Sequence, residues 1–164
     1  MKNTLLKQKI IGLCINGDYS IADLSKELNT SIPTTTKLVE ELIAEGSIEE
    51  MGKLDTNGGR RPSIYGLRAT AGYFVGTDVR RNSVSIAICD FKGHVVEYLD
   101  NLDFTVESSK ASFVNLCNLI IKHLSKCGID RNSVKAYGFN LSGRVNKETG
   151  YCFTYFIGED RPIA

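Results

Sequence analysis

The sequence of 164 residues lacks the features by which membrane, secreted and zinc-binding proteins are usually recognised. No apolar run is long enough to span a membrane, and the first residues, MKNTLLKQKI, lack the apolar core of a secretory signal. The five cysteines include no Cys-x-x-Cys pair, and the two histidines, His94 and His123, have no partners at zinc-ligand spacing. We therefore expect a cytoplasmic protein with free thiols and no bound metal ion.

The sequence also lacks a surplus of charge of either sign. Its formal net charge is +1, with 24% charged and 42% hydrophobic residues, which is ordinary for a soluble protein. Within residues 1–68, acidic and basic residues are balanced. This balance weighs against a nucleic-acid partner, because nucleic-acid-binding domains are often strongly basic.

Residues 21–46, IADLSKELNTSIPTTTKLVEELIAEG, nevertheless predict two short helices joined by a tight turn. The turn residues 29–31 are Asn-Thr-Ser, in which Ser31 is the expected N-cap of the second helix and Pro33 lies in its first turn. Gly46 is the expected C-terminal stop. The helical spacing gives each helix one apolar face, formed by Ile21, Leu24 and Leu28 in the first and by Thr35, Leu38, Val39 and Leu42 in the second.

The opposite face of the second helix carries Thr34, Thr36 and Lys37 near its N-terminus. Short hydroxyls, a flexible cation and the free N–H groups of a helix start are the chemistry that phosphates and base edges require. This pattern is typical of a helix-turn-helix, whose second helix enters the major groove of DNA. The alternative is a helical hairpin of some other small domain.

The residues around this hairpin favour a winged helix-turn-helix over residues 1–68. A first helix is expected from Thr4 to Ile15, and after Gly46 the segments SIEEM and SIYGL alternate like the strands of a β-hairpin. The hairpin has a glycine-rich tip followed by Arg60 and Arg61, which would grip phosphate or enter the minor groove. The alternative is that Arg60 and Arg61 are simply a solvent-exposed pair on the surface. One copy should bind DNA modestly, so we expect a functional dimer.

Residues 69–72 predict a linker, and residues 73–164 predict an α/β unit with a mixed sheet. Three strands (YFVGTD, SVSIAICD and HVVEYLDN) precede a helix that ends at Cys127, and VKAYGFNL forms a further strand. Ser108 or Ser109 caps that helix, and its apolar face consists of Phe113, Leu116, Cys117, Ile120 and Leu124. No second crossover follows, so we expect an incomplete domain or an edge covered by another chain.

The whole chain resembles the ROK (repressor, open reading frame, kinase) family. The segments that carry the resemblance are the winged helix, GGRRPSIYGL, VGTDVRRNSVSIAICDFKGHVV and GFNLSGRVNKETG. The resemblance implies that residues 73–164 are the first portion of a domain of the sugar kinase and actin-like ATPase fold. It also implies a sugar-responsive, bacterial, nucleoid-associated repressor with a double-stranded DNA operator, a sugar or sugar phosphate effector and no membrane partner.

Two parts of the resemblance bear on ligands. Kinase members carry a D-x-G-G-T-K phosphate loop, whereas the matching stretch here runs from Asp78 to Ser83 and has arginines in place of glycines. Ser142, Gly143 and Arg144 match the loop near the sugar, although an ordinary turn would explain them equally well. The catalytic aspartate and the zinc motif of the family would lie beyond Ala164, so we expect no cofactor in this chain.

Three functions remain open on the sequence alone. The leading hypothesis is a repressor of carbohydrate genes that binds DNA through Ser31, Thr34, Thr36, Lys37, Arg60 and Arg61 and is not an enzyme. The second is an ATP-dependent sugar kinase with a DNA-binding head. The third is a structural role, in which the α/β part serves only for dimerisation.

Overall fold

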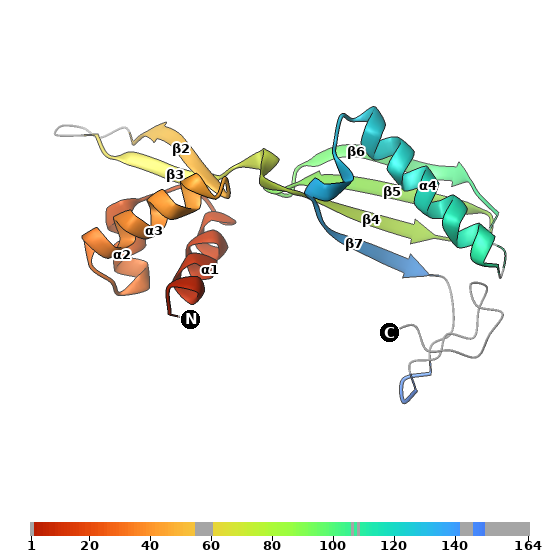
Figure 1. The fold of residues 1–164 in the computed structure, drawn as a ribbon, viewed down its shortest axis with the longest axis horizontal. Coiled ribbons are helices and arrows are strands. Elements are labelled where there is room, and N and C mark those ends of the chain that lie inside the picture. The colour runs from red at the N-terminus through yellow and green to blue at the C-terminus, as the bar shows by residue number, and fades with distance from the viewer. Residues whose placement is uncertain (1, 55–60, 106, 108, 142–145, 150–164) are drawn as a thin grey trace. The chain divides into compact units, whose positions relative to one another are not determined.

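The chain forms two compact units, Met1–Ala71 and Gly72–Ala164 (Figure 1). A computed structural model describes residues 2–54, 61–105, 107, 109–141 and 146–149. Helices and strands occur in both units, and no helix among these residues is long and apolar enough to cross a membrane.

Three helices and a three-stranded antiparallel sheet make up the first unit. In chain order the elements are α1 (Lys2–Cys14), β1 (Tyr19–Ser20), α2 (Ile21–Leu28), α3 (Ile32–Ala44), β2 (Ile48–Lys53), β3 (Ser63–Leu67) and a 3-10 turn, η1 (Ala69–Ala71). The sheet order is β1-β3-β2, so the hairpin strand β3 is central. The short strand β1 was not predicted, because its two residues carry no periodicity of their own.

Helix α3 ends where the sequence predicts and for the predicted reason. Gly46 has a φ of +74°, a left-handed conformation that glycine adopts without steric cost. This conformation lets the N–H of Gly46 donate to the carbonyl of Ile43 (2.9 Å) and that of Ser47 to Leu42 (3.0 Å). The last carbonyls of the helix are therefore satisfied, and the chain turns directly into β2.

The core of the first unit gathers the apolar faces of all three helices against the sheet. Its fully buried side chains come from α1, α2, α3 and the start of β2, and they are Ile10, Leu24, Leu38, Val39, Leu42 and Ile48. The predicted face of α3 thus packs inward, whereas on the predicted face of α2 only Leu24 is buried and Ile21 and Leu28 are partly exposed. Leu5 of α1, by contrast, is 55% exposed.

The buried thiol of Cys14 leads to a first prediction. Burial is the main cause that raises the pKa of Cys14 to about 11, from an ordinary value of 9.0, and nearby Asp18 adds to the shift. Because the thiolate is the reactive form, iodoacetamide should alkylate Cys14 of the native chain at pH 8 far more slowly than Cys89 or Cys117, which are partly exposed. Peptide mass spectrometry with and without urea measures this difference.

The same shift fixes the sign of a pH effect on stability. The folded state binds the thiol proton more tightly than the unfolded chain, so this stabilisation is present below pH 9 and is lost as the pH rises towards 11. Equal alkylation of Cys14 in native and unfolded protein would contradict the burial.

The second unit is a mixed sheet with one helix on one face (Figure 1). Its elements are β4 (Tyr73–Val79), β5 (Ser83–Asp90), β6 (Val95–Asp103), α4 (Lys110–Lys126), a 3-10 turn, η2 (Arg131–Ser133), and β7 (Val134–Leu141). The sheet order is β6-β5-β4-β7, in which only the β4–β7 pair is parallel. The parallel strand β7 follows the helix, as a crossover connection requires.

Helix α4 packs on the sheet through a continuous apolar cluster. Leu116, Ile120 and Leu124 are at most 2% exposed and meet side chains of β4 and β5, namely Val75, Val79, Val84, Ile86 and Ile88. Ser109 caps the helix by accepting from the N–H of Ser112 (3.1 Å). The prediction that Phe113 belongs to the buried face is wrong: it is 47% exposed and packs against the half-exposed ring of Phe139 on the edge strand β7.

Candidate nucleic-acid interface

The turn between α2 and α3 is fixed by local hydrogen bonds. Asn29 has a φ of 51° and ends α2 in a left-handed conformation, which asparagine tolerates better than most residues. Ser25 Oγ donates to the carbonyl of Thr30 (2.6 Å), and the hydroxyls of Thr30 and Thr35 hydrogen-bond at 2.9 Å. The two helices therefore form a defined hairpin, with the N-terminus of α3 at a set position.

Helix α3 separates its buried and exposed residues as the sequence predicts. Ser31 caps it, accepting from the N–H of Thr34 (3.4 Å), and Pro33 lies in the first turn. Thr34 and Lys37 are exposed and Thr36 is partly exposed, whereas Thr35 is completely buried. The exposed side of the first two turns is thus available to a ligand.

The hydroxyls on this side are already engaged within the helix. Thr36 donates its hydroxyl proton to the carbonyl of Ile32 (2.9 Å), and the hydroxyls of Ser31 and Thr34 share one hydrogen bond (2.8 Å). A hydroxyl has one proton to donate and two lone pairs to accept with. While these bonds persist, the three side chains together can donate only one proton to a phosphate.

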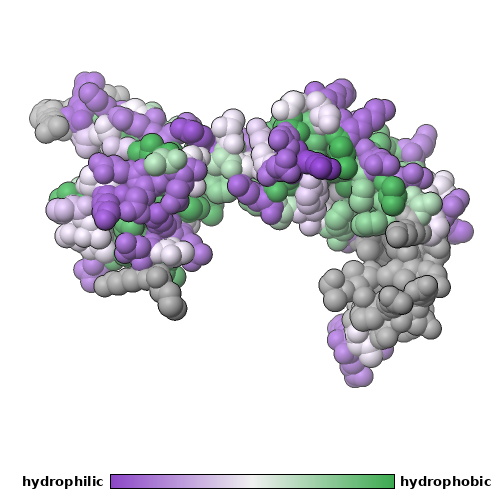
Figure 2. Space-filling model, viewed as in Figure 1, coloured by the Kyte–Doolittle hydropathy of each residue, from purple (hydrophilic) through white to green (hydrophobic). Residues whose placement is uncertain are grey.

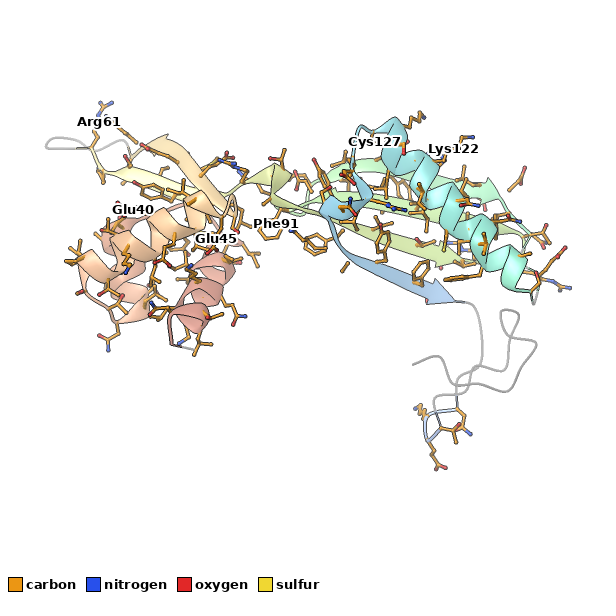
Figure 3. The ribbon with its side chains drawn as sticks, in the orientation of Figure 1. Glu40, Glu45, Arg61, Phe91, Lys122 and Cys127 are labelled. Atoms are coloured by element: carbon orange, nitrogen blue, oxygen red, sulfur yellow. The ribbon has the colours of Figure 1, made fainter. Side chains whose placement is uncertain are left out.

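A groove lies between the helix hairpin and the β-hairpin. Its volume is about 580 Å³, and the ten described residues that line it include two cations and no acid. They are Ser20, Ile21, Ala22, Ile32, Thr36, Lys53, Arg61, Pro62, Ser63 and Tyr65. The groove joins the N-termini of α2 and α3 to the β-hairpin, where Arg61 precedes strand β3 (Figure 3).

Two acidic residues at the end of α3, Glu41 and its C-cap Glu45, face helix α1. Lys7 of α1 forms ion pairs with Glu41 (2.7 Å) and Glu45 (2.6 Å). Hydrogen bonds to these two carboxylates raise the pKa of Lys7, and the hydrogen bond from Lys7 lowers the pKa of Glu41. Hydrophilic side chains cover much of the first unit in Figure 2. Glu41 and Glu45 are therefore neutralised by Lys7, and neither lines the groove that holds Lys53 and Arg61.

The second unit has a cleft of about 470 Å³ near the end of β4, and Asp78, Arg80 and Asn140 are among the residues that line it. Asp78 Oδ2 accepts from Arg80 Nε (3.0 Å) and lies 2.9 Å from Arg80 Nη2, while its Oδ1 accepts from Asn140 Nδ2 (2.8 Å). Asp78 thus pairs with the first side chain beyond its strand. A guanidinium lies where the resemblance implies a glycine.

The described residues cover only some of the predicted site. Thr34, Thr36 and Lys37 share the exposed part of α3, and Thr36 and Arg61 both line the groove. Arg60, Ser142, Gly143 and Arg144 lie outside the described residues.

Sequence reasoning did not single out Ile32, Lys53 or Tyr65, which also line the groove. Helical spacing places Ile32 beside the buried Thr35 and Val39, so its 57% exposure could not be read from the sequence. Lys53 and Tyr65 lie in the paired strands β2 and β3, and only the three-dimensional structure brings them to α3.

Comparison with known proteins gives the following matches. No protein-family model matches the chain. The xylose repressor of Bacillus subtilis is 32% identical over 141 residues, 85% of this chain and 36% of the relative. The xylose repressor of Caldicellulosiruptor bescii is 28% identical over 154 residues, 90% of this chain and 38% of the relative. A crystal structure of a ROK family transcriptional regulator, a homologue of the E. coli MLC protein, matches with a TM-score of 0.57 and 21% identity, over 87% of this chain and 36% of that one.

The chain belongs to the ROK family. It spans about a third of the length of these curated relatives. At 21% identity the structural match establishes the fold alone, and it covers elements of both units because it extends over 87% of the chain. The ROK resemblance expected from the sequence is therefore confirmed, and the relatives named so far are repressors or transcriptional regulators.

Proposed function

We propose that the chain is a sequence-specific DNA-binding regulator that represses genes of carbohydrate metabolism. The observation that carries this proposal is the groove beside the N-terminus of α3, whose described lining includes Lys53 and Arg61 and no acidic residue. Cations next to an exposed helix start suit the phosphate backbone and base edges of DNA. The names of the relatives, xylose repressors among them, support the same function.

In this proposal residues 1–68 are a winged helix-turn-helix, with α3 as the recognition helix and β2–β3 as the wing. Thr34, Thr36 and Lys37 meet the major groove, and Ser31 caps the helix and can touch a phosphate. Because its proton goes to Ile32, Thr36 serves as an acceptor for an adenine or cytosine amino group. Arg60 and Arg61 hold the wing against the neighbouring groove or its phosphates.

Residues 73–164 are, in this proposal, the first portion of a sugar kinase and actin-like domain, joined through a linker at residues 69–72. A sugar or sugar phosphate would control DNA binding, with Ser142, Gly143 and Arg144 beside it. A homodimer would bind a palindromic operator, because paired half-sites multiply the modest affinity of one copy. Such a regulator acts in the cytoplasm at the nucleoid.

A kinase activity is the weaker candidate. A phosphate loop needs backbone N–H groups that phosphate oxygens can approach closely, which glycines allow. Here the Arg80 guanidinium is fixed on Asp78 from two nitrogens, so a side chain fills that approach. We therefore propose that the chain is not an enzyme.

The function is tested by selecting duplexes from a random pool with the full chain and measuring their binding by fluorescence anisotropy. We expect the selected duplex to bind at least about 1,000-fold more tightly than its scrambled version at near-physiological salt, and to weaken steeply as salt is raised. Equal and weak binding to both duplexes would overturn the proposed function.

A further inference from the structure

The first residue of α3 is a large aliphatic side chain that the fold leaves uncovered. Ile32 is 57% exposed, although isoleucine is among the residues most often buried. It lines the groove together with Ile21, Ala22 and Pro62, so its exposed atoms belong to an apolar strip inside a cationic groove. The strip lies at the helix start, the part of a recognition helix that reaches base edges.

The polar neighbours of Ile32 have limited capacity to read bases. Its own carbonyl accepts the hydroxyl proton of Thr36 (2.9 Å), and Ser31 and Thr34 bond to each other (2.8 Å). The hydroxyl groups of this turn therefore use most of their hydrogen-bond donors within the protein. The exposed apolar surface of Ile32, by contrast, remains available for contact with a base.

We propose that Ile32 reads the 5-methyl group of a thymine in the major groove. The four bases present donors and acceptors along this groove, and thymine alone adds a methyl group. The groove also holds two cations, Lys53 and Arg61, on the β-hairpin. These cations can bind phosphates of the same DNA while Ile32 contacts the base. This inference rests on the proposed function, and it adds a base preference and a residue that reads it.

The test removes the methyl group and nothing else. Each thymine of the selected duplex is replaced in turn by deoxyuridine, and binding of the full chain is measured by anisotropy. We expect one position in each half-site to lose about three- to fivefold in affinity, the effect of one buried methyl group. In the Ile32→Ala chain, the same deoxyuridine substitution should change affinity by less than about twofold, because the contact is already gone.

A matched control is available within the first unit. Ile15 is also a highly exposed isoleucine (67%) and does not line the groove, so Ile15→Ala should keep the full deoxyuridine effect. Both variants remove exposed atoms and should unfold in urea like the parent chain, which checks that they are folded.

The outcomes separate the inference from the function on which it rests. A deoxyuridine penalty that persists in Ile32→Ala overturns the inference, as does a parent chain that binds every deoxyuridine duplex as well as the thymine duplex. In both cases the DNA-binding function stands. A chain that selects no duplex overturns the proposed function and the inference with it.

Discussion

Replacing Lys53 and Arg61 together by glutamine is expected to weaken binding to the selected duplex by about 10- to 100-fold at moderate salt. Both residues line the groove beside α3, where no described lining residue is acidic. If each cation neutralises one phosphate, the slope of log affinity against log salt should become shallower by about 2. Anisotropy titrations at several salt concentrations give both quantities.

The chain offers a control with the same change of charge. Lys9 on α1 and Lys122 on α4 are exposed and do not line the groove, and Lys122 belongs to the second unit (Figure 3). The Lys9→Gln, Lys122→Gln chain should keep the salt slope within about 0.5 of the parent, because no phosphate contact is lost. An equal loss in both double variants would mean that net charge, and not the groove, governs binding.

The local parts of this interface could be predicted from the sequence. Ser31, Pro33 and Gly46 determine the start and end of α3 through caps and turn geometry, which act over a few residues. The buried face of α3 followed from the helical spacing of Thr35 and Leu38. The capping box of α2, in which Ser20 and Asp23 bond to each other, has a local signature as well and was overlooked.

The groove itself could not be predicted, because its walls come from separate parts of the chain. Tyr65 lies next to Tyr19 only because β1 pairs with β3, and no periodicity in two residues reveals that pairing. The same holds for Lys7, whose ion pairs with Glu41 and Glu45 depend on how α1 packs against α3. Charge balance read along the sequence therefore did not reveal that the described lining of the groove holds two cations and no acidic residue.

The second unit shows where helical spacing predicts a face but not its burial. Phe113 lies on the same stripe as Leu116 and Ile120, and yet it is half-exposed, because it is in the first turn and packs against Phe139 on the edge strand. A stripe is buried only where the sheet extends beneath it. The width of the sheet and its edge are properties of strand pairing, which α4 alone does not encode.

The difference in burial between Leu116 and Phe113 predicts a large loss of stability for Leu116→Ala. Leu116 is completely buried in the cluster between α4 and the sheet, so truncation leaves a cavity and should lower the free energy of unfolding of the second unit by about 3 kcal/mol. Phe113→Ala removes a larger side chain from the same helix but should cost less than about 1.5 kcal/mol, because the ring is half-exposed.

Hydrogen exchange with mass spectrometry is the suitable measurement, because a chain of two compact units need not unfold in one step. Peptides from β4, β5 and α4 should lose protection in Leu116→Ala, while peptides from α1 to α3 keep theirs. Equal losses in Leu116→Ala and Phe113→Ala would contradict the packing of α4. A loss in both units would instead mean that they unfold together, and the groove would then depend on the core of the α/β unit.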